Sequence, residues 1–188
     1  MKKALSIFIV CFFAISCFAQ EHLSFKGIPI TGSMTEFCRK LSEKGFTKIS
    51  TENNIISFKG VFTGRKATVG VGATADGKNV RAVVVFFEET ENWKTLVNTY
   101  EYYKDIYTRK YGIPLASKEY NPSQENDNFS LMYELIQDKV IYQSVWYVNG
   151  GTIDINIDKY GSLSGVVIIR YMDAQNVETK IQQDIDDI

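Results

Sequence analysis

Nucleophilic catalysis by cysteine or serine needs a base beside the nucleophile, and this sequence contains a single histidine, His22. Cys38 lies on the apolar stripe of a predicted helix, away from His22 along the chain. A reactive thiol needs exposure and a base or a positive field, so we interpret Cys38 as a small buried hydrophobic residue. The sequence therefore predicts no catalytic residue of the Cys–His or Ser–His–Asp type.

Two segments imitate ligand-binding motifs. Residues 70–75 fit the letters G-x-G-x-x-A, but a dinucleotide site needs a helix to start there, and Asp76 with the glycine after it turns the chain into a strand. Asp154, Asn156 and Asp158 imitate the start of a calcium loop. They alternate with isoleucines, however, as in a strand with one wet face. The sequence therefore predicts no cofactor and no metal ion.

Acid–base hydrolysis by two carboxylates is the enzymatic chemistry that stays open, because the chain has 22 aspartates and glutamates. Glycoside hydrolases place two such groups about 5 to 10 Å apart across a pocket. No pair stands out by its sequence context. A hydrolase acting on envelope or dietary glycans is therefore the alternative to the function argued next.

Aromatic residues are distributed unevenly, since all 11 tyrosines lie at or after Tyr100. On the predicted strand 140–148 both faces carry bulky side chains, and Tyr142 and Trp146 share one of them. A sheet with helices on one side leaves its other side wet, so an aromatic patch there indicates a partner. We expect a non-enzymatic binding or interaction module, with Tyr142 and Trp146 as partner-binding anchors. Burial in the core is the alternative for both.

The first 19 residues have the pattern of a secretory signal peptide. A basic start, Met1-Lys2-Lys3, precedes an apolar run over residues 5–13 that is too short to span a bilayer. We predict cleavage after Ala19. The alternative is a lipobox over residues 14–17, with Cys17 lipidated and the protein tethered to a membrane. An exported protein, periplasmic or extracellular, is expected in both cases.

The remaining residues, 20–188, are expected to form a single domain with halves of about 20–90 and 91–188. They hold 19 basic and 22 acidic residues, a net charge of −3. This mild acidity argues against a nucleic-acid binder. Residues 20–188 contain no second long apolar run, so the sequence predicts no membrane span. Another envelope or extracellular protein is the expected partner. Nothing in the composition indicates an oligomeric state.

Three strands are predicted after each of two helices, which cover residues 34–44 and 92–111. The six strands are predicted over residues 55–62, 66–74, 80–88, 140–148, 152–158 and 164–172. Residues 116–128 are predicted to form a mobile polar loop, and Asp173 to cap a C-terminal helix. The expected fold class is α+β: two helix-strand-strand-strand units in an antiparallel sheet with helices on one face. A duplication of one unit is an open alternative to two units of separate origin.

Several short segments resemble a family of small exported proteins of unknown function from anaerobic Gram-negative bacteria. They are residues 25–30, 110–114, 151–153, 171–176 and 185–187. The resemblance spans most of the mature chain but implies no activity. The layout is also similar in outline to the β-lactamase-inhibitor-like fold and to small outer-membrane assembly lipoproteins. That similarity implies protein binding through a sheet face.

Overall fold

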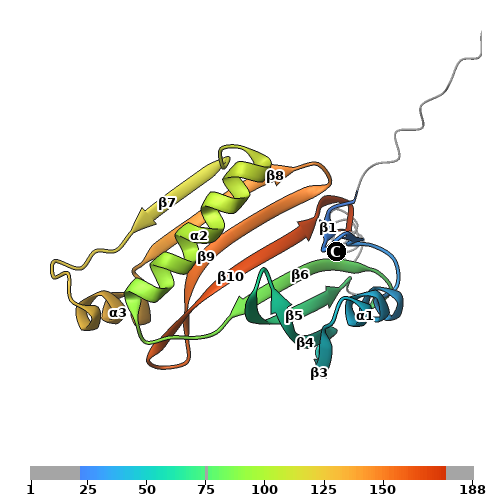
Figure 1. Cartoon of the computed structure of the whole chain (residues 1–188), viewed down its shortest axis with the longest axis horizontal. Coiled ribbons are helices and arrows are strands. Elements are labelled where there is room, and N and C mark those ends of the chain that lie inside the picture. The colour runs from blue at the N-terminus through green and yellow to red at the C-terminus, as the bar shows by residue number, and fades with distance from the viewer. Residues whose placement is uncertain (1–21, 75, 177–188) are drawn as a thin grey trace, which may run out of the picture.

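The structure is a computed structural model that describes residues 22–74 and 76–176. The predicted signal peptide and the lipobox cysteine lie outside these residues. The C-terminal helix predicted after Asp173 is described only for residues 174–176. A large antiparallel sheet dominates the described chain, with helices along one side of it (Figure 1).

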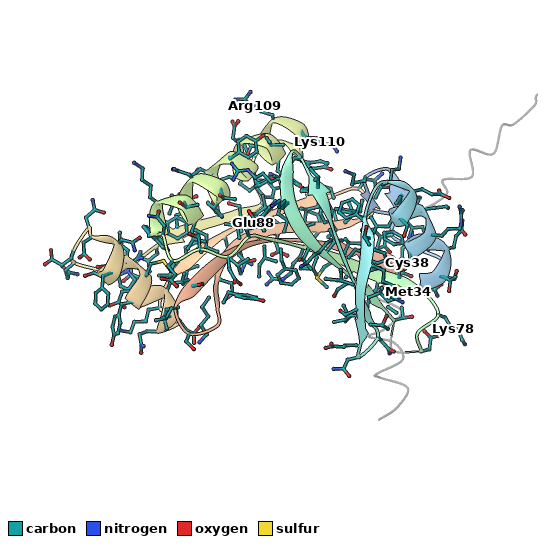
Figure 2. The ribbon with its side chains drawn as sticks, turned by 60° about the horizontal axis from the view of Figure 1, so that its bottom comes forward. Met34, Cys38, Lys78, Glu88, Arg109 and Lys110 are labelled. Carbon is teal, nitrogen blue, oxygen red and sulfur yellow. The ribbon has the colours of Figure 1, made fainter. Side chains whose placement is uncertain are left out.

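The first half begins with a two-stranded hairpin and one helix, and four strands follow. The elements are β1 (Ser24–Phe25), β2 (Ile28–Pro29), α1 (Met34–Glu43), β3 (Thr47–Glu52), β4 (Ile55–Phe62), β5 (Arg65–Ala73) and β6 (Val80–Phe87). The Ser33 side chain accepts a hydrogen bond from the Glu36 backbone N–H, so the N-cap of α1 is confirmed. Figure 2 shows Met34 and Cys38 on this helix.

The second half repeats the order of one helix and four strands, with a short helix inserted. The elements are α2 (Trp93–Tyr111), β7 (Ala116–Tyr120), α3 (Asn128–Ile136), β8 (Ile141–Val148), β9 (Gly151–Tyr160) and β10 (Ser164–Asp173). Asn92 and Asp127 cap α2 and α3 through their side-chain oxygens. The longest helix, α2, crosses the β8–β10 half of the sheet (Figure 1).

The strands form one eight-stranded sheet in the order β3-β4-β5-β6-β10-β9-β8-β7. Each half supplies a four-stranded meander, and the last strands of the two halves, β6 and β10, pair antiparallel at the centre. The expected α+β class with three strands per unit is therefore wrong. The described chain is mostly β, because each unit has a fourth strand and the helices contain fewer residues than the strands.

Within the eight-stranded sheet, the two strands that the sequence did not predict, β3 and β7, form its edges. β3 is polar and joins β4 through Asn53 and Asn54, which both have positive φ, as a two-residue hairpin turn requires. β7 falls in the segment that was expected to be a mobile loop, and it pairs with β8 over five residues. All five β7 residues are exposed. An edge strand can be polar on both faces, because neither face needs to pack in the core. Such a strand therefore lacks the apolar alternation by which a sequence predicts strands.

The described helices all pack on the same face of the sheet. A Cβ atom at Gly165 of β10 would meet Leu96 of α2 and Leu135 of α3. A Cβ atom at Gly60 of β4 would meet the ring of Phe46, which directly follows α1. Glycine thus permits close approach of helix and sheet at both ends. We call this side the helix face and the opposite side the open face.

Aromatic rings on the helix face connect the two halves. Tyr103 of α2 stacks on Phe62 of β4 and on Phe87 of β6, with centroid distances of 6.2 and 4.5 Å. Phe25 of the N-terminal hairpin lies 5.5 Å from Phe62 and 5.2 Å from Tyr171 of β10. Phe25 and Tyr103 are fully buried. The two halves therefore share one core, and the hairpin closes it.

Replacing Gly151 with alanine should lower the free energy of unfolding by about 2 to 3 kcal/mol. The added Cβ atom would lie far inside van der Waals contact with the backbone carbonyl oxygen of Met172, which cannot rotate away. Urea unfolding measures the change. Gly72→Ala is the matched control, because its Cβ atom would come no nearer than 3.9 Å to another atom. Equal stability of the two variants would contradict the close approach at Gly151.

Candidate functional site

Both sequence-predicted anchors, Tyr142 and Trp146 of β8, lie on the helix face. Trp146 is 1% exposed, and its indole N–H donates to the backbone oxygen of Gly112 at 2.9 Å. Tyr142 is half-buried and meets Trp93 and Tyr100 of α2 edge to face. The two side chains share a face of the sheet, but α2 covers it. They therefore belong to the core, and the open face must be described from other residues.

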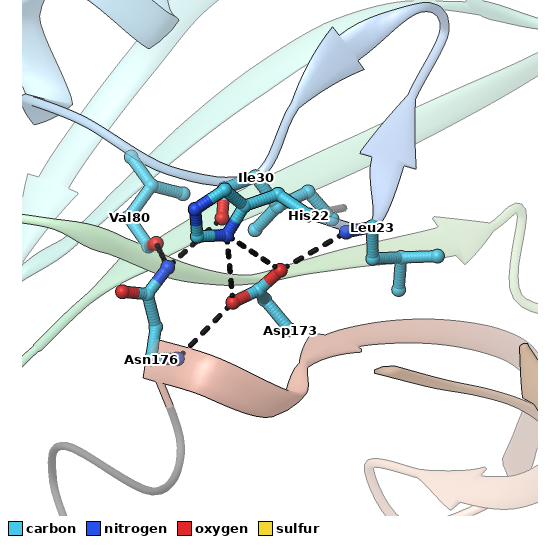
Figure 3. A network of polar contacts seen from close by, with 6 residues as sticks. All are labelled: His22, Leu23, Ile30, Val80, Asp173 and Asn176. Atoms are coloured by element: carbon cyan, nitrogen blue, oxygen red, sulfur yellow. Dashed lines mark hydrogen bonds and ion pairs between the residues drawn. The ribbon is translucent and has the colours of Figure 1, made fainter. Parts of the chain in front are cut away.

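A buried carboxylate fixes the N-terminal segment to the end of β10 (Figure 3). Asp173 is fully buried and accepts hydrogen bonds from the backbone N–H groups of Leu23 at 3.0 Å and Asn176 at 3.1 Å. The His22 ring nitrogen Nδ1 lies 3.1 Å from the same carboxylate. A buried carboxylate needs such partners, because an unpaired charge away from water is costly. The single histidine thus contacts a buried carboxylate and helps to hold the N-terminal segment in place.

The neighbouring amide extends this network to β6. The Asn176 side chain is buried, and its amide nitrogen donates to the backbone oxygens of Ile30 at 3.0 Å and Val80 at 2.9 Å. The chain segment after β2, the start of β6 and the end of β10 are therefore held by two adjacent polar side chains. Sequence reasoning identified Asp173 as a helix cap only. The contacts with residues about 150 positions away gave no local signal.

The open face keeps large apolar side chains in contact with solvent. Ile55 and Val61 of β4 are 47% and 55% exposed. Strand alternation places Phe86 of β6 and Val166 of β10 on the same side. Gly70 of β5 has no side chain, so Ile55 and Phe86 approach each other over it. No described helix covers this face. Its exposed apolar side chains are those of β4, since Val166 is only 2% exposed.

A hollow of about 1120 Å³ opens on this face, at the ends of β4, β5, β6 and β10. Its apolar lining includes Val61, Phe86 and Val166. Its charged lining has both signs: Lys59 and Lys66 come from β4 and β5, and Glu88 and Glu89 follow β6. Figure 2 labels Glu88 between the β4–β5 hairpin and α2. An apolar floor with a rim of both signs is typical of protein interfaces.

A hydroxyl cluster between α2 and β8 has the residue types of a serine nucleophile with a lysine base. Ser144 is buried and lies 2.7 Å from the Tyr100 hydroxyl and 2.8 Å from the Ser117 hydroxyl. Lys104 forms an ion pair with Glu119. Burial alone would lower the pKa of Lys104. The hydrogen bond to Glu119 and the negative charges of Glu101 and Glu119 have a larger effect, so the pKa of Lys104 is raised. A lysine held protonated in this way is a poor base, so the cluster is structural.

Glu101 and Glu119 are two interacting carboxylates beside the hydroxyl cluster. Burial and the nearby Glu119 charge raise the pKa of Glu101. Lys104 lies between them, 3.8 Å from Glu101. Neither glutamate lines either of the two hollows described in this structure. A glycosidase pair needs a pocket for the sugar between its carboxyl groups, and this pair has a lysine there instead.

The other residues that the sequence offered as a nucleophile or as metal ligands, Cys38 and the Asp154 segment, have structural surroundings. Burial raises the pKa of the Cys38 thiol, which disfavours a reactive thiolate. Asp154 pairs with Arg170 at 2.8 Å on the open face, and Arg170 also donates to Asn156. The residues that imitate a calcium loop are thus strand residues beside an arginine. Among residues 22–74 and 76–176, no group of three or more histidines, cysteines or acids could hold a metal ion.

The chain matches no known family model, no curated protein and no solved structure. In the part of the chain that the structure describes, no helix has the length and hydrophobicity needed to cross a membrane.

Asp173→Asn should lower the free energy of unfolding by about 3 kcal/mol. The amide keeps one acceptor oxygen but turns two donor hydrogens toward the groups that now donate to the carboxylate, and buried donors left unpaired are costly. Chemical unfolding measures the loss, and hydrogen exchange at the Leu23 amide shows whether the hairpin detaches. Asp158→Asn is the control, because that side chain is 48% exposed. A loss no larger than that of the control would contradict the role of Asp173.

Proposed function

We propose that this chain is a non-enzymatic protein-binding module of the cell envelope or its exterior, which binds its partner with the open face of the sheet. The observation that carries the proposal is the exposure of Ile55 and Val61 beside the hollow lined by Phe86. Exposed apolar surface of this kind marks interaction sites in soluble domains. Glu88 and Glu89 also line this hollow, but together with Lys59 and Lys66 they form a rim of both signs around apolar side chains, which supports protein binding.

The charges around the hollow favour a protein over a nucleic acid or a membrane surface. Lys59 and Lys66 would attract a polyanion, but Glu88 and Glu89 at the same rim would repel it. A protein surface can match both signs, with apolar side chains at its centre. We infer a partner that offers an apolar segment flanked by acidic and basic residues. Another exported protein fits this description.

Site-specific photocrosslinking in cells of the source organism tests the proposal. A benzophenone side chain at Val61 should form one discrete adduct with another protein, because Val61 borders the hollow. Ile55→Asp should remove that adduct by placing a charge next to Phe86, which lines the hollow, while leaving the thermal unfolding midpoint within a few degrees. The adduct is identified by mass spectrometry.

The same crosslinker at Arg109 is the matched control, because Arg109 lies near the tip of α2 and is also exposed (Figure 2). Adducts that are equal from both positions, or that persist in Ile55→Asp, would contradict binding through the open face. An adduct of twice the mass of the chain would identify a second copy as the partner. Light scattering of the purified protein would then show a dimer.

A further inference from the structure

A second hollow, of about 820 Å³, lies on the helix face. Five separate parts of the chain form its wall: the N-terminal hairpin, the end of β4, the C-terminal half of α2, the β8–β9 turn and Tyr171 of β10. Its volume falls in the range of about 300 to 1,000 Å³ that small-molecule sites occupy. It lies on the other side of the sheet from the proposed protein-binding surface.

The lining carries positive charge and has no aspartate or glutamate in it. Lys26 comes from the hairpin and Lys110 from the end of α2. Neither lysine forms an ion pair with any described carboxylate. Instead, the Lys26 ammonium lies 5.2 Å from the centre of the Phe46 ring, and the Lys110 ammonium lies 4.8 Å from that of Tyr111. Two lysines held by aromatic rings keep their charge available to an anion.

A pair of buried hydroxyl groups forms part of the same wall. The Tyr107 hydroxyl of α2 and the Tyr171 hydroxyl of β10 form a hydrogen bond with each other. Burial raises the pKa of both, so both are protonated at ordinary pH. Only one of the two protons is used in the bond between them. The other hydroxyl hydrogen has no acceptor among the described residues and is available to a ligand oxygen.

We propose that this hollow, the hairpin pocket, binds a small organic anion: a carboxylate carried on an apolar body. Lys26 and Lys110 supply the opposite charge, and the unused hydroxyl hydrogen of the tyrosine pair donates to a carboxylate oxygen. The rings of Phe62, Tyr107 and Tyr111 contact the apolar body. A cationic ligand of the same size is disfavoured, because it would meet two ammonium groups and no carboxylate.

His22 also lines the pocket but already faces Asp173. Its ring is held by that carboxylate, so we do not assign it to the ligand. Lys26 additionally donates to the backbone oxygen of Val61 at 3.5 Å, which orients it without neutralising it. The two lysines and the tyrosine pair are therefore the groups whose removal should change binding.

Isothermal titration of the purified protein with decanoate tests the proposal. Decanoate should bind, while decanol and decyltrimethylammonium, which have the same chain without the negative charge, should bind at least tenfold more weakly. The double variant Lys26→Gln/Lys110→Gln should lose at least tenfold in affinity for decanoate, and Tyr107→Phe about threefold to tenfold. Lys94→Gln is the matched control, since Lys94 is an exposed lysine at the other end of α2. It should bind as the unchanged protein does.

Decanol binding as tightly as decanoate, or unchanged decanoate affinity in the double variant, would overturn the proposal. Lack of decanoate binding at millimolar concentration would overturn it as well. Circular dichroism confirms that each variant is folded, and both lysines are exposed, so their replacement leaves the core intact. Ile55→Asp should bind decanoate normally, which separates failure of this site from failure of the open face.

Discussion

The pairing of β6 with β10 is the contact on which the rest of the structure depends. Each half of the chain folds its four strands into a meander that would leave one long apolar edge strand unpaired. Val83 and Val85 of β6 lie opposite Tyr171 and Ile169 of β10, and all four are buried. A long apolar edge strand tends to pair with strands of other molecules, which leads to aggregation. The pairing of β6 with β10 removes this exposed edge from both halves. The edges that remain, β3 and β7, are largely exposed and polar.

This central pairing also explains why the N-terminal hairpin belongs to the core. On the helix face, part of the sheet near Phe62 and Tyr171 lies beside α2 and is covered by the N-terminal hairpin. Phe25 fills that place, between Phe62 and Tyr171. Asp173 and Asn176 then hold the chain on either side of the hairpin with hydrogen bonds from buried side chains. Buried polar groups of this kind stabilise one arrangement strongly, because any other leaves them unpaired.

Local signals in the sequence were sufficient for most elements. The helix start predicted at residue 34 and the strand end predicted at residue 148 are confirmed, and β5 ends at Ala73, one residue before its predicted end. The edge strands β3 and β7 were missed, because an exposed strand has no apolar alternation to reveal it. Alternation also showed that Tyr142 and Trp146 share a face, but it cannot tell which face a helix covers. Neither hollow could be predicted, since each is built from segments far apart in the sequence.

The two hollows lie on opposite faces of the same strand end. Val61 borders the hollow on the open face, and the next residue, Phe62, lines the hairpin pocket. Lys26 in the pocket donates to the backbone oxygen of Val61, between the two. A ligand that draws Lys26 toward itself would break this hydrogen bond at the edge of the protein-binding surface. Because linkage between sites is reciprocal, a partner that breaks the same hydrogen bond would in turn change the affinity of the pocket.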